Sequence, residues 1–225
     1  MKSPSLLVSS STASTIEPVP EGLHPGVLVS IFDVGTQFSE KFDIAQRKLV
    51  LQFELPDLPP IDAERDGKKV KLPRLVSIRL TRSLNEKARL RALLETWRGR
   101  RFTPPEMEAL DLGKLLSTPA FVQVMHEHKT DGKTFANIAN LMPVSKGTPK
   151  PVATSPTTLF SVDQLETPQD LEEAKLAPWI VELVKTSREF ERLVARATKQ
   201  ASAPSPATPV AAPVSGEPVE DDVPF

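Results

Sequence analysis

The fold of this chain is decided by the stretch KLVLQFEL, which runs from Lys48 to Leu55. Apolar side chains occupy every second position and mostly polar ones lie between them: Leu49, Leu51, Phe53 and Leu55 take one face, and Lys48, Val50, Gln52 and Glu54 the other. This period of two predicts a strand with one buried face. Pro56 and the Pro59-Pro60 pair end the strand, because proline has no backbone N–H to donate to a sheet.

Two other segments in the first third of the chain also predict strands. Val27 to Phe32 is an apolar run that ends at the turn signal Asp33-Val34-Gly35. Residues 36–47 are polar with interspersed Phe and cationic side chains, so they predict a loop or an extension of the strand. Arg74 to Thr81 alternates again, with three side chains expected to point inward: Val76, Ile78 and Leu80.

A helix is predicted after the third strand. Ser83 to Glu86 has the pattern of a capping box, in which the Ser side chain accepts a backbone N–H and the Glu side chain reaches back. Asp111 is expected to cap a second, short helix through Leu116. The first helix runs to about Arg98, before Gly99, and its apolar side chains recur at helical spacing: Leu90, Leu93, Leu94 and Trp97.

Two more strands are predicted from Ala120 to His128 and from Thr134 to Met142, joined by the turn Asp131-Gly132. Three strands, a helix and two strands is the element order of the OB fold, which binds oligonucleotides in many proteins. The expected fold class is therefore mainly β: a five-stranded OB-fold Greek-key barrel with one helix between strands 3 and 4, plus a C-terminal helical extension and a disordered acidic tail.

Two blocks of sequence add a family resemblance. Leu93 to Thr103 reads LLETWRGRRFT, and Asp131 to Ile138 reads DGKTFANI. In these blocks the chain resembles phage-encoded single-stranded-DNA-binding or replication-associated OB proteins, and the resemblance extends over roughly residues 21–195. It implies a barrel that binds single-stranded DNA during replication or recombination.

The last residues form a separate motif. Glu220, Asp221 and Asp222 precede Val223-Pro224-Phe225, and residues 201–219 are mainly Ala, Pro, Ser, Thr and Val, a composition typical of a tether. The ending resembles the acidic C-terminal peptide of bacterial single-stranded-DNA-binding proteins. That resemblance implies a partner-docking tip that recruits replication or recombination proteins; Glu220, Asp221, Asp222, Val223, Pro224 and Phe225 are the expected partner-binding residues.

The predicted organisation has six parts. They are a flexible arm (1–20), the OB-fold domain (21–146), a linker (147–160), a helical extension (161–198), a Pro/Ala-rich tether (199–219) and the acidic tip (220–225). A helix is expected to begin at Pro178, because proline is favoured at the first helical position. Its apolar stripe between residues 178 and 198 is expected either to pack on the barrel or to mediate self-association.

Charge divides the chain in two. Residues 1–150 hold 22 Lys and Arg against 17 Asp and Glu, which gives +5, whereas residues 151–225 hold 6 against 12, which gives −6. The absence of cysteine excludes disulfides and thiolate zinc sites, and it fits the expected cytoplasmic location. No apolar run reaches the length of a membrane span.

A single strand of DNA is held by cations along its phosphates and by aromatic rings against its bases. If the apolar side chains of the central strands point inward, Lys48, Gln52 and Arg79 lie on the outer face of the barrel. On the fifth strand, Ala136 and Ile138 fit the core, which turns Phe135 and Asn137 outward. The predicted nucleic-acid-binding residues are Phe38, Lys41, Phe42, Arg47, Lys48, Gln52, Arg79, Lys129, Lys133 and Phe135.

The sequence thus predicts a protein that coats single-stranded DNA and recruits partners through its tip, without enzymatic activity and without a cofactor. His126 and His128 share one strand face, but no third ligand accompanies them, so no metal site is expected. Two alternatives remain open. One is an OB protein that binds RNA, and the other is an adaptor that binds proteins and no nucleic acid.

Overall fold

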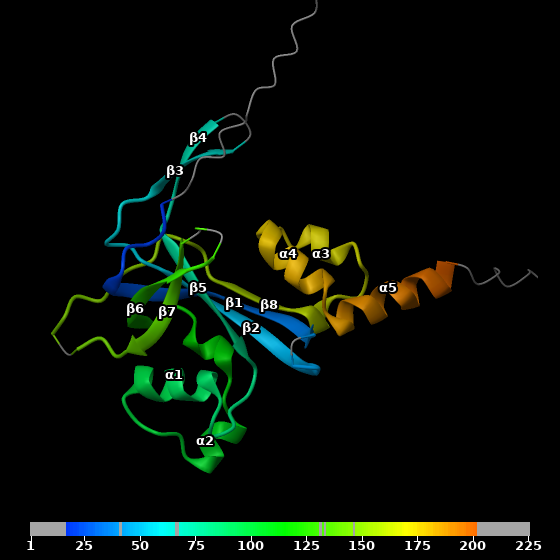
Figure 1. Ribbon diagram of the computed structural model, residues 1–225, viewed down its shortest axis with the longest axis horizontal. Coiled ribbons are helices and arrows are strands. Elements are labelled where there is room, and N and C mark those ends of the chain that lie inside the picture. The colour runs from blue at the N-terminus through cyan, green and yellow to red at the C-terminus, as the bar shows by residue number, and fades with distance from the viewer. Residues whose placement is uncertain are drawn as a thin grey trace, which may run out of the picture.

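The computed structural model describes residues 17–40, 42–65, 68–130, 132, 134–145 and 147–201 (Figure 1). The elements are β1 (Gly22–Ser39), β2 (Ile44–Glu54), β3 (Ile61–Arg65), β4 (Lys68–Leu72), β5 (Leu75–Thr81), α1 (Arg89–Arg98), α2 (Pro104–Glu108), η1 (Leu112–Leu115), β6 (Pro119–His128), β7 (Thr134–Met142), β8 (Thr158–Ser161), η2 (Val162–Gln164), α3 (Asp170–Glu173), α4 (Pro178–Lys185) and α5 (Arg188–Ala201). The protein is mainly β, as predicted. None of the helices in this part of the chain is long and apolar enough to span a membrane.

Six strands form the main sheet. Five lie in the order β5-β2-β1-β6-β7 with antiparallel neighbours, and β8 pairs in parallel with β1. The hydrogen-bonded path is not closed into a barrel, although its two end strands, β5 and β7, contact each other. β3 and β4 form a separate hairpin that projects from the sheet (Figure 1).

Strand β1 is much longer than predicted. Its first part pairs with β6, and the part from Val27 onward pairs with β2, so residues 36–39 extend the strand. Gly26 permits the close packing at the crossover, because an added Cβ would lie only 2.8 Å from Val122 Cγ2 and 2.9 Å from Leu55 Cδ2. The extension leads to the β1–β2 hairpin tip, of which the structure describes residues 38–40 and 42–44.

The inner face of the sheet holds the main core. The predicted inward sets of β2 and β5 are confirmed, since Leu51, Phe53 and Ile78 are buried together there. α1 closes this core: the rings of Phe53 and Trp97 meet edge to face with centroids 5.5 Å apart. The Trp97 indole N–H donates to the Pro119 carbonyl at 2.9 Å, so its polar atom is satisfied within the core.

The predicted start of α1 is wrong. The helix begins at Arg89 after the N-cap Ala88, and the Ser83 hydroxyl instead accepts from the Asn85 N–H at 3.3 Å. Its end is as predicted, because Gly99 is the C-cap with φ 71°, a left-handed conformation that favours glycine. Capping boxes form instead at α2, where Thr103 and Glu106 supply one, and at η2, where Ser161 and Gln164 supply another. The sequence patterns did not predict α2.

A second core covers part of the outer face. The predicted single helix from residue 178 to residue 198 is two helices, α4 and α5, separated at Thr186-Ser187. Phe32 and Val50 of the sheet are buried against side chains of this C-terminal region, including Ile180, Val184 and Phe190. Of the two expectations for the apolar stripe, packing on the sheet accounts for these buried residues.

The segment predicted to be a linker is tied to the sheet. The Glu54 carboxylate, 1% exposed, accepts hydrogen bonds at 2.8 Å from the backbone N–H groups of Thr154 and Ser155 and from the Thr154 hydroxyl. Burial alone would raise the pKa of Glu54, but these hydrogen bonds lower it below its usual value. Residues 158–161 then add to the sheet as β8.

Candidate functional site

The outer face of β2 and β5 carries a strip of polar side chains, Lys48, Gln52, Ser77 and Arg79, called here the β2–β5 strip. Lys48 Nζ donates to Gln46 Oε1 at 2.8 Å and to Thr81 Oγ1 at 2.7 Å. Burial and the nearby Arg79 charge lower the pKa of Lys48. Neither cation forms an ion pair with a carboxylate in the described part of the chain. The strip therefore presents positive charge that an anion can neutralise.

The strip is narrower than the sequence predicts. Gln52 lies opposite Ser77 in the register, and both are half-buried. Val50, between Lys48 and Gln52 on the same face, is buried by the second core. The C-terminal helices thus occupy the part of the outer face nearest β1 and leave the β2–β5 edge accessible.

The β1–β2 hairpin tip presents apolar groups. Phe38 is 51% exposed, Phe42 64% and Ile44 42%. Phe38 and Ile44 belong to the paired strands, and Phe42 lies in the turn between them. The Arg188 guanidinium carbon lies 6.0 Å from the centre of the Phe38 ring. Lys41, predicted to contribute here, lies outside the described residues.

The hairpin between β6 and β7 presents another aromatic ring. Phe135 is 42% exposed, and Lys129 Nζ lies 4.5 Å from the centre of its ring. The predicted orientation of β7 is confirmed, because Ile138 is buried while Phe135 and Asn137 face outward. Lys133 lies outside the described residues.

Arg47, predicted to bind nucleic acid, is engaged inside the protein. Its Nε donates to both Asp33 carboxylate oxygens at 3.0 Å, and its Nη2 pairs with Asp163. Arg82 Nη1 completes the cluster at 2.6 Å from Asp33 Oδ2. This cluster joins β1, β2 and η2, so Arg47 has a structural role and is not available along the β2–β5 strip.

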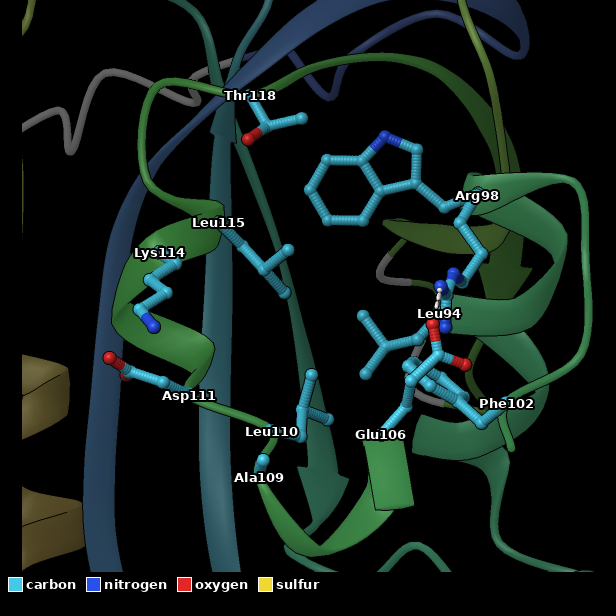
Figure 2. A pocket seen from close by; sticks show the side chains of 11 residues that line it. Leu94, Arg98, Phe102, Glu106, Ala109, Leu110, Asp111, Lys114, Leu115 and Thr118 are labelled. Carbon is cyan, nitrogen blue, oxygen red and sulfur yellow. Dashed lines mark hydrogen bonds and ion pairs between the residues drawn. The ribbon is translucent and has the colours of Figure 1, made fainter. Parts of the chain in front are cut away.

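A pocket of about 440 Å³ lies between α1, α2 and η1 and is called here the α1–α2 pocket (Figure 2). Figure 2 shows Leu94 and Arg98 of α1 on one side and Leu110 and Leu115 on the other. Its walls are mainly apolar, and they include Leu94, Trp97, Phe102, Leu110 and Leu115. Sequence patterns did not indicate this pocket, because they did not predict α2 or the return of the chain along it.

Arg98 is one of four charged side chains that line the α1–α2 pocket; the others are Glu106, Asp111 and Lys114. Arg98 Nη2 pairs with Glu106 Oε1 at 2.6 Å, and Arg98 Cζ lies 4.4 Å from the centre of the Phe102 ring. Hydrogen bonds from Arg98 and from the Thr103 backbone hold the pKa of Glu106 well below its usual range. Arg98 Nη1 is buried and has no hydrogen-bond partner among the residues that the structure describes, a rare state for a buried donor.

The two histidines of β6 have structural partners. His126 Nε2 lies 2.8 Å from the Val19 carbonyl oxygen, and His128 Nδ1 lies 3.0 Å from Thr134 Oγ1. Within the described ranges, no group of three or more His, Asp or Glu side chains is arranged to hold a metal ion.

Comparison of the chain with protein-family models finds no match, and comparison with curated proteins finds none either. The predicted docking tip, residues 220–225, lies outside the described residues. The candidate functional features of the described residues are the β2–β5 strip, the two hairpins and the α1–α2 pocket.

Proposed function

We propose that this protein binds single-stranded DNA without sequence preference. One observation carries the proposal: of the four exposed Phe and Trp rings in the described part of the chain, three lie in the β1–β2 and β6–β7 hairpins. These are Phe38, Phe42 and Phe135, and the fourth is Trp179. Exposed aromatic rings are costly in water and are well suited to stacking on bases.

The topology supports an OB-type fold, in which the barrel is open rather than hydrogen-bonded all round. The chain follows the OB element order, with β1, β2 and β5 first, then α1, then β6 and β7. β5 and β7 are the two end strands of the sheet, and they contact each other. In OB folds the face of strands 2 and 3, with the loops after strands 1 and 4, binds oligonucleotides. The corresponding features here are the β2–β5 strip and the two hairpins.

The chemistry of these three features is complementary. Phe38, Phe42 and Phe135 offer stacking surfaces at two separate hairpins, while Lys48 and Arg79 offer positive charge on β2 and β5. Base stacking is indifferent to sequence because every base has a flat face, and phosphate contacts are equally indifferent. We therefore propose a role in coating exposed strands during replication or recombination.

A second part of the proposal concerns residues 220–225. Three acids followed by Val-Pro-Phe suit a partner that has a small apolar pocket ringed by Lys or Arg. We propose that this segment recruits replication or recombination proteins to the coated strand. Pro224 restricts one backbone angle and so reduces the entropy lost on docking.

The test is a titration of labelled single-stranded DNA, single-stranded RNA of the same length and duplex DNA at two salt concentrations. We expect the tightest binding to single-stranded DNA, with a log–log salt slope of about −0.7 per phosphate contact. Preference for RNA would support the RNA-binding alternative. Absence of binding to all three would support a protein adaptor, and equal affinity for duplex would contradict the proposed site.

A further inference from the structure

We propose that the α1–α2 pocket binds residues 221–225 of the same molecule, with the Phe225 ring inside the pocket and Asp221 and Asp222 at its rim. None of the predicted DNA-binding residues lines this pocket. The proposal is therefore independent of the proposed DNA site and assigns a second binding site to the protein.

The pocket has the size and lining of a site for one apolar side chain and its neighbours. Its volume of about 440 Å³ falls within the range of small-ligand sites, roughly 300–1,000 Å³. Leu94, Leu110 and Leu115 supply aliphatic walls, and Trp97 and Phe102 supply aromatic ones. An aromatic ring would bury apolar area against both kinds of surface.

A buried guanidinium N–H group without an acceptor among the described residues indicates that the occupant supplies an acceptor, and a carboxylate is the strongest one. Arg98 Nη1 is buried without a hydrogen-bond partner, while the other end of the same guanidinium is paired with Glu106. A buried donor left unsatisfied is unfavourable, and a carboxylate satisfies it more strongly than a neutral acceptor does. A ligand in the pocket can therefore contribute the hydrogen-bond acceptor that Arg98 Nη1 lacks among the described residues.

The charges around the pocket favour the same occupant. Glu106 is already neutralised by Arg98 and by Arg100, whose Nη2 lies 2.6 Å from Glu106 Oε1, and the Asp111 carboxylate accepts the Gly113 N–H at 2.9 Å. Lys114 is exposed on the pocket lining. Arg98 and Lys114 balance Glu106 and Asp111 among the lining residues, and Arg100, which pairs with Glu106 beside the pocket, adds one positive charge that attracts an acidic peptide.

The chain contains one terminal segment of this chemistry outside the described residues. Residues 1–16 contain no aromatic residue and no acid, whereas residues 202–225 contain three consecutive acids followed by Val223-Pro224-Phe225. Twenty-four residues follow Ala201 (225 − 201 = 24) and could span at most about 80 Å when extended. A domain of this size has a radius of gyration of about 16 Å, so the segment can reach the pocket.

Attachment to the same chain makes docking favourable even if the intrinsic affinity is low. A segment joined to the pocket by a chain of this length is held at an effective concentration that free protein in dilute solution does not reach. Docking in the same molecule would keep the segment from partners until a partner with a better pocket competes for it.

The two tryptophans provide a direct test with the full chain. Trp97 lines the pocket and is 5% exposed, whereas Trp179 is 43% exposed and lies elsewhere, on α4. In a Trp179→Phe protein all tryptophan fluorescence comes from Trp97. We expect that adding Phe225→Ala shifts the Trp97 emission to longer wavelength and increases its quenching by acrylamide. A peptide with the sequence of residues 217–225 should reverse both changes saturably, and the same peptide with Phe225→Ala should not.

A charge reversal at the rim provides the second arm. Lys114→Glu should weaken binding of that peptide by about fivefold, because it replaces an attraction at the surface by a repulsion. Lys150→Glu changes the net charge equally at an exposed position that does not line the pocket, and should leave peptide affinity unchanged. Unchanged Trp97 fluorescence on Phe225→Ala, or equal weakening by both reversals, would overturn the proposal. A fluorescence change that grows with protein concentration would overturn docking in the same molecule.

Discussion

Lys129 Nζ lies 4.5 Å from the centre of the Phe135 ring, at the end of the β6–β7 hairpin. The ammonium covers one face of the ring, while the ring as a whole remains 42% exposed. In the proposed DNA-binding site a base would stack on the uncovered face, and the ammonium beside it would meet a phosphate.

Replacing Phe135 with Ala should weaken binding to single-stranded DNA. The loss of one stacked base corresponds to about 1–3 kcal/mol, which is roughly 5- to 150-fold in affinity. Trp179→Ala is the matched control, because Trp179 is equally exposed but lies outside the two hairpins. Fluorescence anisotropy of a labelled oligothymidylate measures both. An equal loss in the two variants would mean that exposed aromatic area, rather than the hairpin, governs binding.

Replacing Arg79 with Gln should change the salt dependence of binding. Arg79 is exposed on the β2–β5 strip without a carboxylate partner in the described part of the chain, so a phosphate is its expected counterion. Removing one phosphate contact should flatten the log–log salt slope by about 0.7. Lys87→Gln, which removes an exposed cation beside α1, serves as the control and should retain the original slope. A slope unchanged by Arg79→Gln would remove Arg79 from the site.

Arg47 should behave in the opposite way. Arg47→Gln removes the double hydrogen bond to Asp33, which is 8% exposed, and leaves Arg82 as its remaining cation. We expect the free energy of unfolding to fall by about 1–3 kcal/mol, as measured by urea denaturation. The folded protein should bind single-stranded DNA with unchanged affinity and salt slope. A lower slope with unchanged stability would instead return Arg47 to the DNA-binding site.

The alternation of apolar residues was sufficient to predict much of the sheet. Leu51, Phe53 and Ile78 are buried, as the period of two predicts. Alternate side chains of a strand point to opposite faces of the sheet, so the apolar set must lie on the covered face. Gly99 likewise ended α1 as predicted, since its φ of 71° suits glycine. These features are determined by residues close together in the sequence, so a local sequence pattern is enough to predict them.

The features that were wrong or missed depend on distant contacts. α1 begins five residues later than the capping pattern at Ser83 indicated, because Ser83 forms a local turn with Asn85. Arg47 looked like a free cation, and only the fold brings Asp163 to it, 116 residues away in the chain. Val50 looked like an exposed position, and the C-terminal helices bury it. The candidate site was predicted in outline at both hairpins, but its width was set by this packing.

The acidity of Glu54 leads to a prediction of how stability depends on pH. Its carboxylate is buried and accepts three hydrogen bonds from Thr154 and Ser155. These donors hold its pKa below the usual 4.5 in the folded protein, despite burial. The unfolded chain therefore binds this proton more readily than the folded protein does. The stabilisation is complete above about pH 4.5 and is lost as the pH falls further.

Replacing Glu54 with Gln should remove that dependence. The amide N–H₂ of Gln would face at least one of the backbone donors, so at neutral pH we expect the free energy of unfolding to fall by about 1–3 kcal/mol. Below pH 4.5 the stability of this variant should decline less steeply than that of the original protein, because Gln does not titrate. Urea unfolding across this pH range measures both effects, and Glu86→Gln, at an exposed position, is the matched control. Parallel pH profiles for Glu54→Gln and the original protein would contradict this prediction. They would show that the Glu54 carboxylate, which binds residues 154 and 155 to β2, does not contribute to the pH dependence of stability, and that other carboxylates determine it.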